Sequence, residues 1–201
     1  MKKLNGYSLA GMSMSRDRVQ EDFYATPAES TKALLAVEEI LYPALEPACG
    51  QGHISKLLDQ EQTFSFDLID RGFSEMTMDF LEDFQDVMAN IVFDSRTRNG
   101  VRTIITNPPF SLFQEFAERA LEIAQDKVIL FGKLQALEGK KRATFMENSP
   151  LKTVYVFKSR QNPLRNGSGL DEKGKPWSST MAFAWFVWEQ EFTGSPIIKW
   201  I

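Results

Sequence analysis

The spacing of apolar residues changes along the chain between the period of a strand and the period of a helix. The β-branched run Val101–Thr106 stops at two prolines, and Leu112–Gln125 then places apolar residues three and four positions apart. This succession predicts a strand, a sharp turn and an amphipathic helix. Further helices are predicted over Glu29–Glu39 and Leu81–Ala89, and a third begins at Ile54–Leu58. Further strands are predicted over Leu41–Pro47, Thr63–Ile69, Met76–Phe80, Val128–Phe131, Thr153–Phe157 and Met181–Trp188. Strands that alternate with helices predict an α/β fold, with helices on both faces of a largely parallel sheet.

Length and composition predict one domain. The chain has 201 residues, of which 43% are hydrophobic, enough for a sizeable core. Residues 1–20 lack clear periodicity and are expected to form a flexible N-terminal arm before a single domain over 21–201. Residues 160–179 are polar and rich in glycine and proline, which predicts a long loop within that domain.

The same composition argues against several classes of protein. No run of about 18 uncharged apolar residues exists, and no apolar signal core follows Met1, so we expect a cytoplasmic protein without a membrane partner. A single cysteine, Cys49, excludes an internal disulfide framework, and a single histidine, His53, leaves too few ligands for zinc. No metal is expected.

Charge is unevenly distributed along the chain. The formal net charge is -4, which argues weakly against a nucleic-acid partner. However, Lys133–Lys175 contains ten basic and four acidic residues, whereas Asp59–Asp94 contains ten acidic residues and one basic residue. The basic segment is thus a candidate for contacting phosphates, and a solvated surface stretch is an equally good interpretation. Its candidate DNA contacts are Lys140, Lys141, Arg142, Arg160 and Arg165.

Two acidic positions and a glycine turn suggest a nucleoside site. Glu46 ends a predicted strand, and the turn with Gly50 and Gly52 lets backbone pass close beneath a flat ligand. Glu46 would accept a hydrogen bond from a cationic amino group, although a tight turn with a solvated glutamate explains the pattern equally well. Asp67 lies 17 residues after Gly50, near the end of the next strand, where a carboxylate is expected to bind the ribose hydroxyls. Asp70 remains an alternative to Asp67.

The sharpest chemical signal is Asn107–Pro108–Pro109–Phe110, directly after a β-branched run. The lone pair of an adenine amine is delocalised into the ring, which makes the nitrogen a poor nucleophile. If the Asn107 side-chain oxygen and the Pro108 carbonyl each accept one N–H, the nitrogen is pushed toward tetrahedral geometry. Phe110 offers a face for base stacking. An ordinary strand-ending turn before a core phenylalanine is the alternative interpretation.

These motifs together resemble a family. Asp22–Pro27 (DFYATP), Leu45–Gly52 (LEPACGQG), Asp67–Gly72 (DLIDRG), Asp79–Phe80 and Thr106–Phe110 (TNPPF) occur in this order. They resemble the adenine-specific, amino-methylating DNA methyltransferases, notably the compact type found in phage and bacterial genomes. The resemblance implies S-adenosylmethionine as cofactor and a Rossmann-like methyltransferase fold, with a seven-stranded, mostly parallel sheet whose last strand is antiparallel.

The resemblance also implies a role for each matched position. Asn107, Pro108, Pro109 and Phe110 would form the catalytic clamp, and many relatives have tyrosine where this chain has Phe110. The cofactor's methionine end would contact Tyr24, Thr26, Pro27, Glu46, Ala48, Gly50 and Gly52. Its ribose would contact Asp67, and its adenine Asp79 and Phe80. No separate target-recognition domain fits in this length, which suggests that specificity comes from a partner or a homo-oligomer.

Other acceptors share the tetrapeptide. Methyltransferases that act on RNA base amines or on a protein glutamine amide also carry Asn-Pro-Pro-aromatic, although tyrosine at the fourth position would fit the glutamine enzymes better. The basic second half favours a nucleic acid, and double-stranded or single-stranded DNA is the expected partner. A non-catalytic relative that binds the cofactor and DNA or protein is the remaining alternative.

Overall fold

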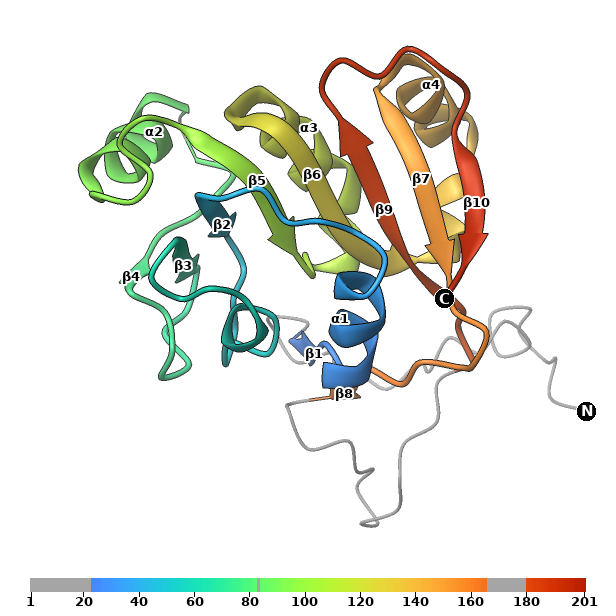
Figure 1. Ribbon diagram of the computed structural model, residues 1–201, viewed down its shortest axis with the longest axis horizontal. Helices are drawn as coiled ribbons and strands as arrows, with labels where there is room; N and C mark the ends of the chain where they lie inside the picture. The colour runs from blue at the N-terminus through green and yellow to red at the C-terminus, as the bar shows by residue number, and fades with distance from the viewer. Residues whose placement is uncertain (1–22, 83, 166–179) are drawn as a thin grey trace, which may run out of the picture.

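The computed structural model describes residues 23–82, 84–165 and 180–201, and its centre is one eight-stranded sheet (Figure 1). The strands of this sheet, in chain order, are β2 (Ala44–Glu46), β3 (Thr63–Asp67), β4 (Met76–Thr77), β5 (Val101–Thr106), β6 (Ala124–Lys133), β7 (Leu151–Val156), β9 (Phe183–Glu189) and β10 (Ile197–Trp200). Two further short strands, β1 (Tyr24–Ala25) and β8 (Leu164–Arg165), pair with each other in a separate antiparallel ribbon.

The strand order in the sheet is β10-β7-β9-β6-β5-β2-β3-β4. Every neighbouring pair is parallel except the two that involve β9, which runs antiparallel to both β6 and β7. The Rossmann-like α/β fold is therefore confirmed. The strand count is eight instead of seven, because β10 adds an edge strand parallel to β7. As a result, the antiparallel strand is not the last strand of the chain.

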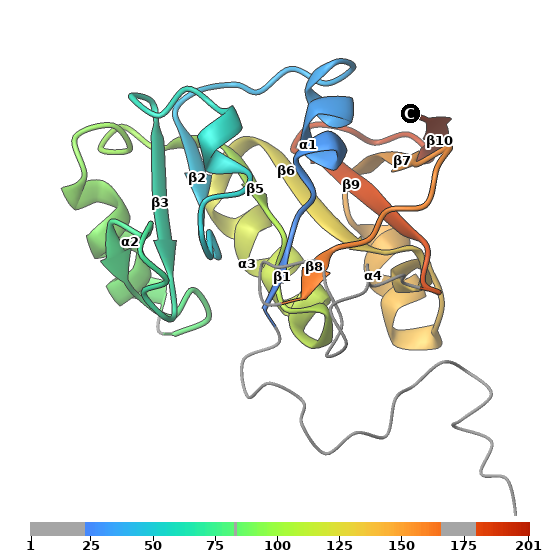
Figure 2. The same cartoon turned by 90° about the horizontal axis from the view of Figure 1, so that it is seen from below.

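Helices cover both faces of the sheet, as the alternating pattern predicted. Figure 2 shows α2 (Phe84–Phe93), α3 (Phe113–Ile123) and α4 (Lys140–Asn148) on one face and α1 (Ala28–Leu35) on the other. The described residues also form three short 3-10 turns: η2 (Ser55–Leu57), η3 (Phe110–Leu112) and η4 (Leu134–Leu137). Within the described part of the chain, three helices cover one face of the sheet and the two-turn helix α1 covers the other.

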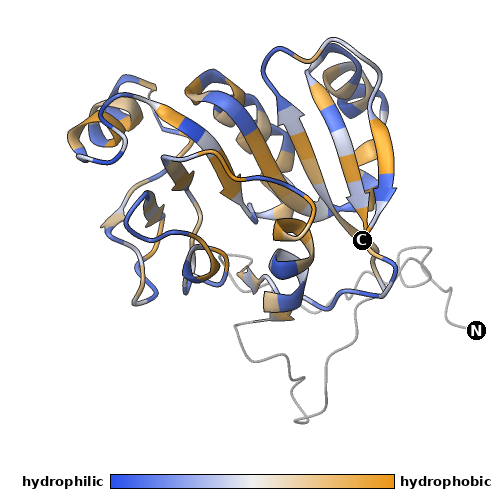
Figure 3. Ribbon diagram, in the orientation of Figure 1, coloured by the Kyte–Doolittle hydropathy of each residue, from blue (hydrophilic) through white to orange (hydrophobic). Residues whose placement is uncertain are grey.

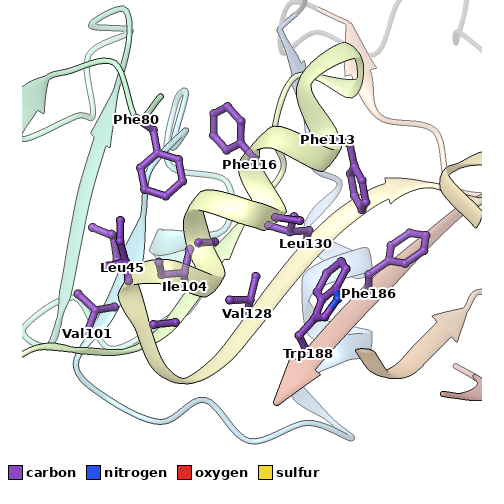
Figure 4. Close-up of a cluster of buried hydrophobic side chains, with 14 of the residues drawn as sticks. Leu45, Phe80, Val101, Ile104, Phe113, Phe116, Val128, Leu130, Phe186 and Trp188 are labelled. Carbon is purple, nitrogen blue, oxygen red and sulfur yellow. The ribbon is translucent and has the colours of Figure 1, made fainter. Parts of the chain in front are cut away.

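The alternating side chains of the central strands build two cores. Along β9, Phe186 and Trp188 pack with the α3 side, whereas Trp185 and Val187 pack with Leu34 of α1. Figure 4 shows the first of these cores, where α3 lies over the sheet. Both indoles are fully buried, and they lie on opposite faces because residues three apart on a strand point to opposite sides of the sheet. Each indole also has a hydrogen-bond acceptor, so neither leaves a buried donor unpaired.

Figure 3, which is coloured by hydropathy, shows apolar residues on the inner strands and on the edge strand β10. The inner strands β6 and β9 are buried along most of their length, as expected for strands that are covered on both faces. The edge strand β10 is different, because Ile197, Ile198 and Trp200 are all exposed. Its sequence did not fit the period of a covered strand, which is why it was not predicted.

Several element boundaries differ from the sequence prediction. The helix expected to begin at Ile54–Leu58 is only the 3-10 turn η2, which ends at Leu57. The helix predicted over Leu81–Ala89 corresponds to α2, which spans Phe84–Phe93. The predicted N-terminal arm and most of the predicted 160–179 loop lie outside the described residues, and the end of that loop which is described contains β8.

Candidate active site

A cavity of about 600 Å³ opens at the carboxyl ends of β2, β3, β4 and β5. In the sheet, β2 has β3 on one side and β5 on the other, so the chain reverses its direction of winding at this point. Open α/β sheets bind ligands at such a switch point. Most residues predicted from the sequence line this cavity: Tyr24, Thr26, Glu46, Ala48, Asp67, Asp79, Phe80, Asn107, Pro108, Pro109 and Phe110.

Three predicted cofactor residues do not line the cavity: Pro27, Gly50 and Gly52. Pro27 instead precedes α1, and its carbonyl accepts the Ser30 N–H at 2.9 Å. Gly50 and Gly52 adopt φ values of 54° and 75°, which disfavour any residue with a Cβ. A Cβ on Gly50 would lie 2.2 Å from Cε2 of Phe23, and one on Gly52 would lie 2.5 Å from the Phe73 ring. The glycines therefore make room for aromatic side chains of the protein itself.

Glu46 is buried at the end of β2, with 1% of its surface exposed. Its Oε2 accepts the backbone N–H of Ser55 at 2.9 Å and also the Ser55 hydroxyl. Burial, with a smaller contribution from the nearby Asp67, raises the pKa of the Glu46 carboxyl to about 8, although the hydrogen bonds from Ser55 act in the opposite direction. At neutral pH the carboxyl is thus largely protonated, and a cation placed beside it would favour its ionised form.

Asp67 and Asp70 have different surroundings. Asp67 ends β3 and lines the cavity, and its Oδ2 accepts the Gly50 N–H at 2.7 Å. This bond joins the carboxylate to the glycine turn and leaves lone pairs for further donors. Asp70 is exposed and accepts the Gly72 N–H at 2.7 Å within its own loop. Of the two carboxylates, Asp67 is the one that lines the cavity.

Asp79 and Phe80 follow β4 at the same end of the sheet. The Asp79 Oδ1 accepts the Leu81 N–H at 2.8 Å, which holds the carboxylate at the cavity wall. Phe80 is buried and packs against Phe66 and Phe116, with ring centroids 6.1 and 5.2 Å away. Its position therefore depends on the core as well as on the cavity.

Asn107 occupies the end of β5 with one half of its amide satisfied. Its Nδ2 donates to the Tyr24 carbonyl at 2.7 Å. Its Oδ1 is buried and has no hydrogen-bond partner among the described residues. A buried acceptor without a donor costs about 1–3 kcal/mol, so this oxygen is a strong candidate for contacting the hydrogen of a ligand.

Phe110 is surrounded by two kinds of partner. Its ring stacks on the Tyr24 ring, with centroids 5.7 Å apart and planes at 28°. The Nζ of Lys133 lies over the Phe110 ring, 4.7 Å from the centroid. Tyr24, which was predicted to contact the methionine end of the cofactor, therefore contacts both Asn107 and Phe110.

Several residues without a predicted role also line the cavity, among them Phe23, Arg71 and Met78. The Arg71 guanidinium lies 4.6 Å from the Phe23 ring centroid, so these two close the same wall. His53 lines the cavity as well, and burial lowers its pKa, which keeps the imidazole neutral at pH 7. Phe23 belongs to the DFYATP segment and Arg71 to the DLIDRG segment, whereas Met78 lies outside the motifs that carry the resemblance.

The predicted DNA-contacting residues are dispersed. Lys140, Lys141 and Arg142 begin α4 and are exposed, and Arg160 is exposed before β8. The backbone of Arg165 pairs with Tyr24 in the β1–β8 ribbon. Arg142 lines a second cavity of about 360 Å³, which shares Phe110 with the first.

Comparison with known proteins gives structural matches but no sequence match. No protein-family model matches the chain, and no curated protein does. A structure described as a class I S-adenosylmethionine-dependent methyltransferase from Listeria monocytogenes matches with a TM-score of 0.54 and 15% identity, over 98% of this chain and 71% of that chain. One described as an RNA methyltransferase from Pyrococcus horikoshii has a TM-score of 0.55 and 14% identity, over 90% of this chain and 94% of that chain.

A third structure links the fold to DNA modification. It is described as a modification subunit of a type I restriction enzyme from Vibrio vulnificus, and it matches with a TM-score of 0.51 and 11% identity, over 97% of this chain and 50% of that chain. The chain therefore has the fold of class I S-adenosylmethionine-dependent methyltransferases, and the cofactor that this fold implies is S-adenosylmethionine.

The structure also bears on metal binding and on membrane insertion. Among residues 23–82, 84–165 and 180–201, no group of three or more histidine, cysteine or acidic side chains is arranged to hold a metal ion. In the same part of the chain, every helix is too short or too polar to cross a membrane.

Proposed function

We propose that this protein is an S-adenosylmethionine-dependent methyltransferase that methylates the exocyclic amine of adenine in DNA. The observation that carries the proposal is the Asn107 amide: Nδ2 is fixed on the Tyr24 carbonyl, while the buried Oδ1 has no partner in the described chain. An amine needs an acceptor of this kind, placed beside a nucleoside site. Asp67 and Glu46 line the same cavity and supply that site.

The residues at the cavity fit the proposed cofactor. The cavity volume of about 600 Å³ is ample for a nucleoside with an amino-acid tail. The Asp67 carboxylate would accept hydrogen bonds from the ribose hydroxyls of the cofactor, and Asp79 would accept one from the amine of the cofactor's own adenine. Glu46 would face the cationic amino group of the cofactor. Bound S-adenosylmethionine would supply a methyl group attached to a positively charged sulfur.

The acceptor end would activate a weak nucleophile. The Asn107 Oδ1 and the Pro108 carbonyl would each accept one N–H of the adenine amine, which frees the nitrogen lone pair for the methyl carbon. Pro109 has no backbone donor to compete for that carbonyl and fixes its direction. The acceptor nitrogen becomes strongly acidic on methylation, so its proton would pass to water without a dedicated base.

Stacking on Phe110 would hold the base, a contact worth about 1–3 kcal/mol. An adenine in duplex DNA must leave the stack to reach this concave site, at a cost of a few kcal/mol. Single-stranded DNA avoids that cost and is expected to be the faster substrate for the chain alone. Sequence recognition in duplex DNA would then come from a partner subunit or from a second copy, and the Vibrio neighbour is itself described as a subunit.

A transfer assay with tritiated cofactor tests the proposal. The purified chain is offered duplex DNA, single-stranded DNA, RNA of the same sequence and a glutamine-containing peptide, and the methylated product is identified by mass spectrometry. We expect N6-methyladenine in DNA. Methylation of the RNA or of the peptide glutamine, and not of DNA, would identify a different substrate. Cofactor binding without any transfer would support the alternative that the protein is a non-catalytic relative.

The Asn107→Ala variant ties the assay to the site. It should bind the cofactor as the wild type does and lose transfer. Asn90→Ala is a matched control, because Asn90 is half-buried on α2 and lines neither cavity, and its Nδ2 donates to the backbone of its own helix. Unimpaired transfer by Asn107→Ala would contradict the proposed role of the tetrapeptide.

A further inference from the structure

The second cavity lies next to the proposed methyl-transfer site. Its volume is about 360 Å³, and it shares Phe110 and Ser111 with the larger cavity. The other lining residues come from the start of α3, from η4, and from the basic side chains at the end of β6 and on α4: Phe113, Gln114, Glu115, Lys133, Gln135, Ala136 and Arg142. The catalytic tetrapeptide therefore ends at the boundary of two cavities.

The two cavities differ in chemistry. The carboxylates proposed to hold the cofactor, Glu46, Asp67 and Asp79, line only the larger one. The smaller one has two cationic side chains, Lys133 and Arg142, and one carboxylate, Glu115. This pattern matches a ligand that carries negative charge and that enters beside Phe110.

We infer that the second cavity binds the phosphodiester next to the methylated nucleotide, with Lys133 and Arg142 as its cationic contacts. The inference rests on the proposed function, because it assigns this cavity to the acceptor strand. A nucleotide whose base stacks on Phe110 must place its phosphates close by, since a single strand carries one phosphate about every 3.4 Å along a helix axis. Lys133 is suited to reach one, because its Nζ lies 4.7 Å from the Phe110 ring centroid.

Arg142 is held in a suitable way for the same task. Its Nε donates to the Glu138 carbonyl at 2.7 Å, which anchors the guanidinium with one of its five N–H donors. The planar fork of a guanidinium matches two phosphate oxygens, whereas lysine acts as a point charge. The glutamine amides of Gln114 and Gln135 complete a polar wall. An uncharged polypeptide around a target glutamine would gain little from this pair of cations.

Salt dependence of binding tests the inference separately from methyl transfer. Fluorescence anisotropy would measure the affinity of the full chain for a labelled, adenine-containing single-stranded DNA, and for RNA of the same sequence, across a salt titration. The test variant is Lys133→Gln/Arg142→Gln, and the control is Arg98→Gln, which removes an exposed arginine that lines neither cavity. The slope of log K against log salt is negative, and each lost phosphate contact on a single strand reduces its magnitude by about 0.7.

We expect the double variant to lose about 1.4 from the salt slope and to bind the oligonucleotide about tenfold more weakly at low salt, a typical change for lost phosphate contacts. Cofactor affinity, measured by calorimetry, should stay at the wild-type value, as should the slope of Arg98→Gln. The conservative variant Lys133→Arg/Arg142→Lys should retain most of the slope. A stronger dependence with RNA than with DNA would identify RNA as the source of the phosphate and would support the same contact.

Two results would overturn the inference. One is a double variant with the wild-type salt slope, and the other is a glutamine peptide that competes for the site while the oligonucleotide does not. Failure of the proposed function looks different. In that case the wild type would bind DNA through Lys133 and Arg142 and yet methylate no adenine.

Discussion

The Asn107 Nδ2 donates to the backbone carbonyl of Tyr24 at 2.7 Å, across 83 residues of sequence. Tyr24 lies in β1, which pairs with β8, so the orientation of the Asn107 amide depends on a ribbon outside the main sheet. The bond fixes which end of the amide is a donor. It leaves the oxygen as the atom available to an incoming amine.

Exchange of that amide for a carboxylate is expected to abolish transfer. In Asn107→Asp, an oxygen replaces the donor that faces the Tyr24 carbonyl, so two acceptors meet and the buried carbonyl loses its partner. We expect transfer to fall on the order of 10²- to 10³-fold, as when one positioned polar group is removed from an active site. The free energy of unfolding should fall by about 1–3 kcal/mol. Single-turnover transfer and chemical denaturation would measure the two effects, and near-normal transfer would refute the role of the amide.

Alanine at the glycine turn is expected to disturb packing as well as backbone. A Cβ at Gly50 would lie 2.2 Å from the Phe23 ring, whereas one at Gly72 would meet nothing within 4 Å, and both glycines have positive φ. Gly72→Ala therefore reports the backbone strain alone, about 1–3 kcal/mol. Gly50→Ala should lower the melting temperature further and weaken cofactor binding.

The contact with Phe23 can be tested directly. In Gly50→Ala/Phe23→Ala the clash is absent, so the double variant should be less destabilised than the sum of its single variants. Thermal melts of the four proteins would give this coupling. Simple additivity would show that the ring does not constrain Gly50.

Asp67 and Asp70 form a natural pair of test and control. Asp67→Asn keeps the shape of the side chain but removes the negative charge that accepts the Gly50 N–H at 2.7 Å. Charge-assisted hydrogen bonds contribute about 1.5–3 kcal/mol, so cofactor affinity should fall by about tenfold or more. Asp70→Asn changes an exposed residue outside the cavity and should leave the affinity unchanged. Calorimetric titration of both variants decides between them, and the reverse order of effects would assign the ribose to Asp70.

Stability should depend on pH through Glu46. Burial raises the pKa of this carboxyl from 4.5 to about 8, so the folded protein binds the proton more tightly than the unfolded chain. The stabilisation is complete below the unfolded pKa of 4.5 and is lost as the pH rises through about 8. The slope approaches about 1.4 kcal/mol per pH unit at its steepest. Denaturation of the wild type and Glu46→Gln between pH 5 and pH 8 should show this slope only in the wild type.

Cofactor binding should release a proton for the same reason. The cationic amino group proposed to face Glu46 favours the ionised carboxylate, so binding at pH 7 displaces the proton that burial retains. Calorimetry in two buffers with different heats of ionisation would measure the release. Glu46→Gln should bind without it. Equal heats in both buffers for the wild type would place the amino group elsewhere.

The α/β fold and many of the residues that line the cavity could be predicted from the sequence because their signals are local. The glycine turn, the run Val101–Thr106 and the two prolines each specify their own backbone, and parallel strands bring their carboxyl ends to one edge. The spacing of Trp185 and Trp188 fixed their opposite faces for the same reason. In the structure, Asp67, Asp79 and Asn107 line a single cavity.

Long-range contacts account for what the sequence did not predict. Nothing in the Tyr24 segment indicates that β1 pairs with β8, and the apolar residues of β10 are exposed, so their pattern carries no sign of a covered strand. The glycines were interpreted as room for a ligand, whereas Phe23 and Phe73 occupy that room. Ring positions set by contacts across the fold leave no mark on local periodicity.

The interior position of β9 has a consequence for how the chain is made. This strand is inserted between β6 and β7, and it leaves the ribosome after both. A nascent chain that stops before Phe183 therefore carries two apolar strands with unpaired edges, which are templates for aggregation. We expect a nascent chain of this length to depend on chaperones. We expect protease resistance only after synthesis has continued far enough for Glu189 to emerge.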